Sequence, residues 1–198
     1  MEAKEKQMLK VAIIIGSTRS HRLGERVAQW VELASKEMKD WDITVLDLKK
    51  ISLPFYDEIS VPAEMDRKYP NPKVQAWSKS IEEADAYLII TPEYNHSVPA
   101  PLKNAIDWLY PEWANKPAAL VGYSTSSTGG ARAIEHLRNI LATLAVATVR
   151  TGLTIGRAQD IIDEKGTCKD ENLNKVLRTE FTQLDDWGRA MSSLLKKK

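Results

Sequence analysis

The sequence has 198 residues and a net charge of +1, with 43% hydrophobic and 28% charged residues. These proportions are those of a globular protein, and the length suits one domain over residues 1–198, since chains usually divide only past about 250 residues. The balanced charge gives no support for a nucleic-acid or membrane partner. We expect the three closing lysines, Lys196 to Lys198, to complement the dipole of a final helix.

Cys168 is the only cysteine, which excludes an intramolecular disulfide and a four-cysteine metal site. No other group of side chains shows metal-ligand spacing, so we expect no bound metal. Met1 to Met8 is charged and polar, lacks the apolar core of a signal peptide, and is expected to be disordered. The apolar runs elsewhere are far shorter than the ~20 residues of a membrane helix. We therefore expect a cytoplasmic protein.

In chain order, the first apolar β-branched run predicts a buried strand at Val11–Ile15, which ends at Gly16. Apolar residues at helical spacing follow over 23–38, and a second strand is predicted at Ile43–Leu48. The stretch Leu53–Pro72 contains four prolines and reads as a loop. Such a long connection is usually functional or covered by a partner.

The second half continues the alternation of helices and strands. We predict strands at Ala86–Thr91, Ala118–Tyr123 and Val146–Arg150. The expected helices cover about 73–84, 99–109, 131–144 and 173–195, and prolines in the first turn of the second are tolerated. Five strands separated by helices indicate an α/β fold, an open parallel sheet with helices on both faces. Ligands of such sheets bind beyond the carboxyl ends of the strands, which directs attention to the loops after strands one, three and four.

The first of these loops, Gly16 to Gly24, combines hydroxyls, two arginines and the start of a helix. Backbone N–H groups at a helix start bind anions, and arginine binds phosphate with paired hydrogen bonds. The alternative is an ordinary turn in which Ser20 caps the helix. Neither the dinucleotide nor the Walker glycine pattern is present, so a monophosphate is the expected ligand.

The second loop, Thr91 to Pro99, is stiffened by Pro92 and Pro99 and offers the flat ring of Tyr94. Backbone amides near Tyr94 and Asn95 could bond the polar edge of a heteroaromatic ligand; alternatively the tyrosine packs on the core. His96 has no evident partner, which disfavours it as a general base. The third loop, Ser124 to Gly130, ends in paired glycines, which permit positive φ or close approach to a ligand.

Together these motifs resemble the NADPH-dependent FMN reductase family, which includes quinone, azo and chromate reductases. The likeness rests on Gly-Ser-x-Arg from Gly16, Pro-Glu-Tyr-Asn from Pro92, the following run from Leu102 to Trp108, and the Gly-Gly loop. It extends over about Leu9 to Gly156. The resemblance implies a flavodoxin-like, doubly wound five-stranded parallel sheet in the order 2-1-3-4-5.

The resemblance also implies where FMN is held. It assigns the FMN phosphate to the first loop, the isoalloxazine ring to the second, and its opposite flank to the third. The chain departs from many relatives at Arg22-Leu23-Gly24, where Arg22 would replace a hydroxyl and an amide as the phosphate donor. The expected cofactor-binding residues are Ser17, Thr18, Arg19, Arg22, Leu23, Gly24, Pro92, Glu93, Tyr94, Asn95, Ser124, Gly129 and Gly130.

The activity implied is an FMN-dependent oxidoreductase that takes hydride from NADPH or NADH and reduces quinones, free flavin or similar small acceptors. The expected scheme is ping-pong at one shared site. No catalytic residue is expected, because the flavin carries the redox chemistry. Glu93 is more simply a residue that holds its loop through backbone hydrogen bonds. The physiological acceptor stays open, with selectivity expected from the loop around Phe55, Tyr56 and Tyr69 and from a neighbouring subunit.

Two other functions fit an FMN-binding chain. One is a flavodoxin-type electron carrier, which the arginines and the balanced charge disfavour. The other is a redox sensor that docks a partner through the loop at 54–72. The resemblance further implies a homodimer or homotetramer. Trp108, Tyr110 and Trp113 fit either such an interface or the core.

Overall fold

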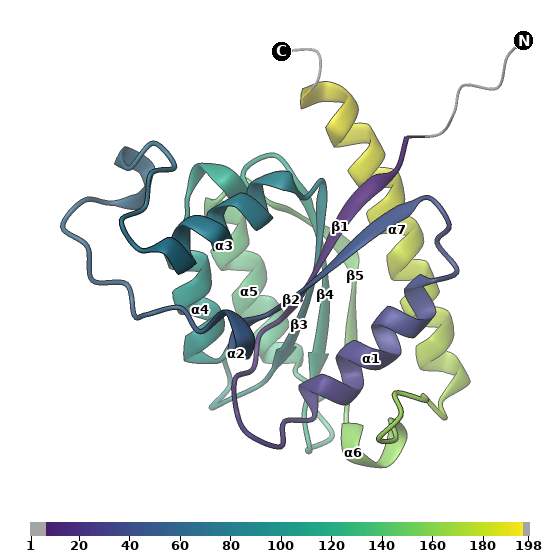
Figure 1. Ribbon diagram of the computed structural model, residues 1–198. Helices are drawn as coiled ribbons and strands as arrows, with labels where there is room; N and C mark the ends of the chain where they lie inside the picture. The colour runs from purple at the N-terminus through teal and green to yellow at the C-terminus, as the bar shows by residue number, and fades with distance from the viewer. Residues whose placement is uncertain (1–6, 196–198) are drawn as a thin grey trace, which may run out of the picture.

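The computed structural model describes residues 7–195, and a five-stranded parallel sheet forms its centre (Figure 1). The strands follow the order β2-β1-β3-β4-β5, which confirms the expected topology. The expectations for Lys196 to Lys198 and for most of 1–8 lie outside the described residues, while Gln7 and Met8 precede the first strand without regular structure. The strand bounds are β1 Leu9–Ile15, β2 Trp41–Asp47, β3 Ala86–Pro92, β4 Pro117–Tyr123 and β5 Ala147–Ile155.

Burial explains why the strands could be predicted from apolar runs in the sequence. Every residue of β3 and β4 is buried, as are all but one of β1, because these strands lie inside the sheet with helices on both faces. β2 lies at the edge and has exposed residues in its middle. Each face packs its own apolar core.

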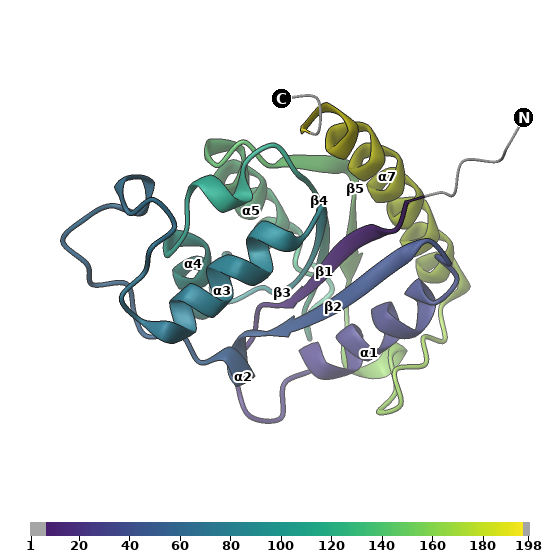
Figure 2. The ribbon, with the colours of Figure 1, turned by 45° about the horizontal axis from the view of Figure 1, so that its top comes forward.

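The helices divide between the two faces of the sheet (Figures 1 and 2). One face is covered by α1, Gly24–Ser35, and α7, Glu171–Leu195; the other by α3, Pro72–Glu83, α4, Ala100–Asp107, and α5, Ala131–Thr143. Four short elements were not expected from the sequence: α2 Leu48–Ile51, η1 Pro62–Glu64, η2 Pro111–Trp113 and α6 Ala158–Ile161. Within residues 7–195, no helix has the length and apolar character needed to cross a bilayer.

β5 is longer than expected and contains a bulge. Ala118 pairs with Thr148 whereas Leu120 pairs with Gly152, so β5 has two more residues than β4 across this stretch. The sequence expectation stopped at Arg150 because the polar and glycine residues of the bulge interrupt the apolar run. The irregularity is stable because side chains of α5 and α7 bond its freed backbone groups.

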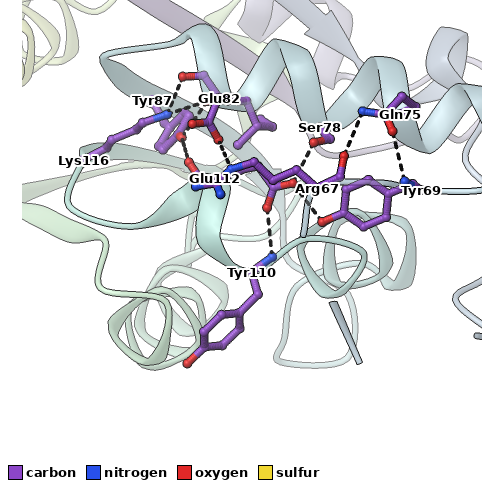
Figure 3. Close-up of polar contacts among 10 residues, drawn as sticks. Arg67, Tyr69, Gln75, Ser78, Glu82, Tyr87, Tyr110, Glu112 and Lys116 are labelled. Atoms are coloured by element: carbon purple, nitrogen blue, oxygen red, sulfur yellow. Dashed lines mark hydrogen bonds and ion pairs between the residues drawn. The ribbon is translucent and has the colours of Figure 1, made fainter. Parts of the chain in front are cut away.

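The loop between α2 and α3 swings away from the body of the molecule but is anchored at its end (Figures 1 and 3). Glu112 is buried, and its Oε1 accepts hydrogen bonds from Tyr69 Oη at 2.8 Å and from Ser78 Oγ at 2.6 Å. Burial and the hydrogen bond to Glu112 raise the pKa of Tyr69. Tyr69 is thus a buried anchor at one end of the loop from which acceptor selectivity is expected.

The aromatic cluster beside α4 belongs mainly to the core. Trp108 and Trp113 are 2% and 0% exposed, so of the two alternatives, interface or core, the core holds for both. Their indole N–H groups bond backbone carbonyls, which lets large aromatic rings be buried without an unsatisfied donor. Tyr110 alone of the three is exposed.

Candidate functional site

The loops after β1, β3 and β4 meet at the carboxyl edge of the sheet, below the strands in Figure 1. They enclose an open cavity of about 320 Å³. Of the residues expected at the site, those that line it are Arg19, Arg22, Leu23, Pro92, Glu93, Tyr94 and Ser124. His21, Tyr123, Thr125 and Ser126 complete the lining. Motifs that are far apart in the sequence therefore form one site.

The first loop leaves a helix start open toward this cavity. α1 begins at Gly24 after Leu23, and no side chain caps it, so the alternative of Ser20 as N-cap is not what the structure has. Ser17 is buried, and its Oγ lies 3.0 Å from Tyr94 Oη. Arg19 is exposed, with its guanidinium carbon 5.7 Å from the centre of the Tyr94 ring. Open N–H groups, a hydroxyl and an uncommitted cation are the donors that an anion requires.

Arg22 is held very differently from Arg19. Its side chain is buried, with Nη1 donating to the Ser17 carbonyl and Nη2 donating to Asp47 at 2.7 Å and to Glu25 at 3.0 Å. Burial by itself lowers the pKa of Arg22, but the hydrogen bonds and charge of Asp47 and Glu25 outweigh it and raise the pKa. The guanidinium thus braces the loop from behind against the end of β2. This geometry favours a positioning role over the direct phosphate contact suggested by the sequence.

The second loop forms a two-residue hairpin turn. Tyr94 and Ser97 exchange backbone hydrogen bonds of 2.9 and 3.0 Å, and Asn95 and His96 between them both have positive φ. Such a turn matches the twist of its flanking residues, and asparagine tolerates the left-handed region well. The Tyr94 N–H is therefore engaged within the protein, whereas Asn95 and His96 are exposed at the turn.

Glu93 links the second loop to the third. Its carboxylate accepts hydrogen bonds from the Arg132 Nε at 2.7 Å and from the Arg132 backbone N–H at 3.1 Å. Burial alone would raise the pKa of Glu93, but the bonds from Arg132 and from the Ala133 backbone reverse this and lower it. The residue caps the start of α5, which otherwise has no side-chain cap. Its geometry suits the loop-holding role and not that of a proton donor.

The third loop depends on its glycines for close backbone packing. Gly129 and Gly130 have φ of +64° and +87°. A Cβ on Gly130 would lie 2.7 Å from the Tyr123 backbone nitrogen, and one on Gly129 would lie 2.9 Å from the Ile155 nitrogen. Both glycines thus let the loop fold onto the ends of β4 and β5, and both are buried behind the cavity instead of lining it.

Tyr123 is a lining residue absent from the expected set. It ends β4, and a Cβ on Gly24 would lie 2.6 Å from its hydroxyl, so the glycine makes room for the phenol. Burial raises the pKa of Tyr123, and hydrogen bonds from Ser17 and the Gly24 backbone offset this only in part. Its position at the carboxyl end of a predicted central strand was the one signal available in the sequence.

The remaining expected residues surround the cavity without lining it. Ser17 and Gly24 lie behind its wall, and Thr18 faces a neighbouring cavity. The donors therefore gather on the first loop, and the flat Tyr94 ring stands beside them. This arrangement fits a ligand with one phosphate and a planar ring system, which is the chemistry of FMN. Among the described residues, no cluster of side chains suits a metal ion.

Comparison with known proteins decides the family. The profile described as NADPH-dependent FMN reductase matches residues 9–160, most of the chain. The chain belongs to the NADPH-dependent FMN reductase family. As a member, it is an FMN-dependent oxidoreductase with NAD(P)H as its substrate.

Individual relatives agree with this assignment. A 2-hydroxy-1,4-benzoquinone reductase of Burkholderia sp is 32% identical, over 91% of this chain and 97% of the relative. An NAD(P)H-dependent FMN reductase of Saccharomyces cerevisiae is 37% identical, over 67% of this chain and 73% of its own. Among solved structures, FerB, a flavoenzyme NAD(P)H:acceptor oxidoreductase of Paracoccus denitrificans, superposes with a TM-score of 0.73 at 25% identity. That match covers 90% of this chain and 98% of FerB. The flavodoxin-like fold of this FMN reductase family member is thus confirmed.

Proposed function

We propose that this enzyme reduces small quinones or free flavin with electrons from NAD(P)H, and that FMN is held in the cavity formed by the three loops. The observation that carries the proposal is the convergence of the family motifs of β1, β3 and β4 on that one cavity. One relative, matched over 91% of this chain and 97% of its own length, is a 2-hydroxy-1,4-benzoquinone reductase. This supports quinones as the acceptor class.

The chain's own residues bind and orient. Arg19 and the open start of α1 are the proposed phosphate donors, with Arg22 fixing the loop that presents them. Tyr94 forms a flat wall, held through its hydroxyl by Ser17. Bound FMN would supply the hydride chemistry. The protein need supply no acid or base there, which agrees with a Glu93 committed to Arg132 and an exposed His96.

The oligomer and the cellular location belong to the same proposal. We infer a homodimer or homotetramer in the cytoplasm. Support for the oligomer comes from a surface cavity of about 460 Å³ between α4 and α5, lined by Ile106, Leu109 and Ile140 beside the exposed Tyr110. Apolar hollows with an aromatic residue at the rim are typical of subunit contacts.

Anaerobic titration tests the function. The FMN-loaded protein should lose its visible flavin absorbance on addition of one NAD(P)H per FMN, and a benzoquinone should restore it. Absence of bleaching, or accumulation of one-electron-reduced flavin without turnover of any quinone, would identify an electron carrier. A redox-dependent partner without quinone turnover would identify a sensor.

A further inference from the structure

A second cavity lies directly behind the first loop. Its volume is about 310 Å³, and it is bounded by the first loop, α2, the following loop and the start of α4. Thr18 lines this cavity, whereas the next residue, Arg19, lines the proposed FMN cavity. One loop therefore forms part of the wall of both cavities. A ligand longer than FMN's ring system could reach from one to the other across it.

An exposed aromatic ring is fixed at the rim of this second cavity. Phe55 is 77% exposed, although exposure of so large an apolar side chain is unfavourable. Its backbone is nevertheless immobilised on both sides by Asn104: Nδ2 donates to the Pro54 carbonyl at 2.8 Å, and Oδ1 accepts from the Tyr56 N–H at 2.9 Å. Trp108 Nε1 also donates to the Pro54 carbonyl at 2.8 Å. The exposed ring is thus presented on a rigid support, as a stacking surface must be.

The polar groups of this cavity favour an anion. Lys49 lines it from α2, and no carboxylate within residues 7–195 forms an ion pair with this lysine. The nearby carboxylate of Asp47 is committed to Arg22 and to the Lys49 backbone N–H. Thr18 and Ser52, which carry hydroxyl groups, line the same cavity. A free ammonium with hydroxyls beside it binds phosphate as a point charge.

The cavity thus offers a flat ring for stacking and a cation for a phosphate, and a phosphorylated purine nucleoside has the two matching groups. We propose that this cavity binds the adenosine half of NADPH, with adenine stacked on Phe55 and the 2′-phosphate paired with Lys49. The inference rests on the proposed function, which places FMN in the neighbouring cavity, where the nicotinamide half of the same molecule has to meet it. A neutral quinone would make no use of the uncompensated charge of Lys49, which is why the nucleotide is favoured as the occupant.

The charge is tested with Lys49→Gln, and Lys50→Gln is the matched control because Lys50 is exposed on α2 but does not line the cavity. Lys49→Gln should raise the KM for NADPH about tenfold and leave the KM for NADH within twofold. The Kd of 2′,5′-ADP for the FMN-loaded protein, measured by calorimetry, should rise by a similar factor. The control should change none of these. Equal behaviour of the two variants overturns the assignment of Lys49.

The ring is tested with Phe55→Ala, and Ile59→Ala is the control because it removes another exposed apolar side chain of the same loop. Phe55→Ala should raise the KM for NADPH and NADH alike by about fivefold and leave the KM for benzoquinone unchanged. A change confined to benzoquinone would assign the cavity to the acceptor instead. Binding of 2′,5′-ADP that depends on Lys49, in a protein that does not oxidise NADPH, would retain this site and reject the proposed function.

Discussion

Two arginines of the first loop differ in role because they differ in partners. Arg22 is surrounded by Asp47, Glu25 and the Ser17 carbonyl, so its donors are used inside the protein. A buried guanidinium needs such partners, because an unpaired charge in the interior is costly. Arg19 is exposed, and its guanidinium carbon lies 5.7 Å from the centre of the Tyr94 ring. It is the arginine free to meet an incoming anion.

Arg19→Ala should accordingly weaken FMN binding by about 1.5–3 kcal/mol, the range for hydrogen bonds to charged groups. Fluorescence titration of the apoprotein with FMN measures this directly. Arg178→Ala is a suitable control, since Arg178 is a surface arginine of α7 paired with Glu37 and does not line the cavity. Equal FMN affinity in Arg19→Ala and wild type would remove Arg19 from the phosphate site.

The bulge of β5 shows how elements can compensate for an irregular strand. From α7, Glu180 Oε1 accepts the Leu120 N–H at 3.0 Å, and Gln183 accepts the Thr151 N–H at 3.1 Å. From α5 on the opposite face, Arg138 Nη1 donates to the Val149 carbonyl at 2.8 Å. Backbone groups that lack strand partners are thus bonded by side chains, which explains why polar residues lie on the buried sides of both helices.

Glu180 makes the stability of this arrangement depend on pH. It is fully buried, and desolvation raises its pKa from 4.5 to about 8. Between these values the folded state holds a proton that the unfolded state has released. The free energy of unfolding should therefore fall as pH rises from about 5 to 8, by up to about 1.4 kcal/mol for each pH unit from this group.

Glu180→Gln should remove that dependence, because an amide oxygen still accepts the Leu120 N–H and does not ionise. Urea unfolding at pH 5, 6, 7 and 8 measures the free energy of unfolding of the variant and of the wild type. Asp186→Asn is the exposed control on the same helix. Buried Lys116 has its effect at higher pH. Burial lowers its pKa to about 8, so above pH 8 the folded state binds fewer protons than the unfolded state, and the free energy of unfolding rises with pH. Parallel curves for Glu180→Gln and wild type would contradict a protonated Glu180.

At the scale of the whole molecule, the parallel sheet brings its three functional loops to one edge, where together they line an open cavity. The proposed nicotinamide position and the acceptor position must share that opening. Double-reciprocal plots for NADPH and a benzoquinone should therefore give parallel lines, as expected when the two substrates bind in turn. Intersecting lines would show that both bind together, and the single shared site would have to be abandoned.

The local pattern of apolar and polar residues was sufficient to predict much of this architecture. Strands such as β3 are nearly continuous apolar runs because both of their faces are buried, and such a run can be recognised from the sequence alone. Placement of the loops after β1, β3 and β4 then followed from the rule for parallel sheets. The run from Pro92 to Trp108 further indicated the family, which the match over residues 9–160 confirmed.

Other features required the tertiary structure, because they depend on partners distant in the sequence. Whether Arg22 faces a ligand or the interior is decided by Asp47 at the end of another strand. The bulge of β5 is stable only because Glu180 reaches it from α7, and no periodicity within β5 reveals that. Trp108 is a core residue because the Pro54 carbonyl accepts its N–H. The sequence thus determined the five strands, the long helices and where their loops meet, whereas packing decided the direction of each side chain, since direction is set by contacts and not by spacing.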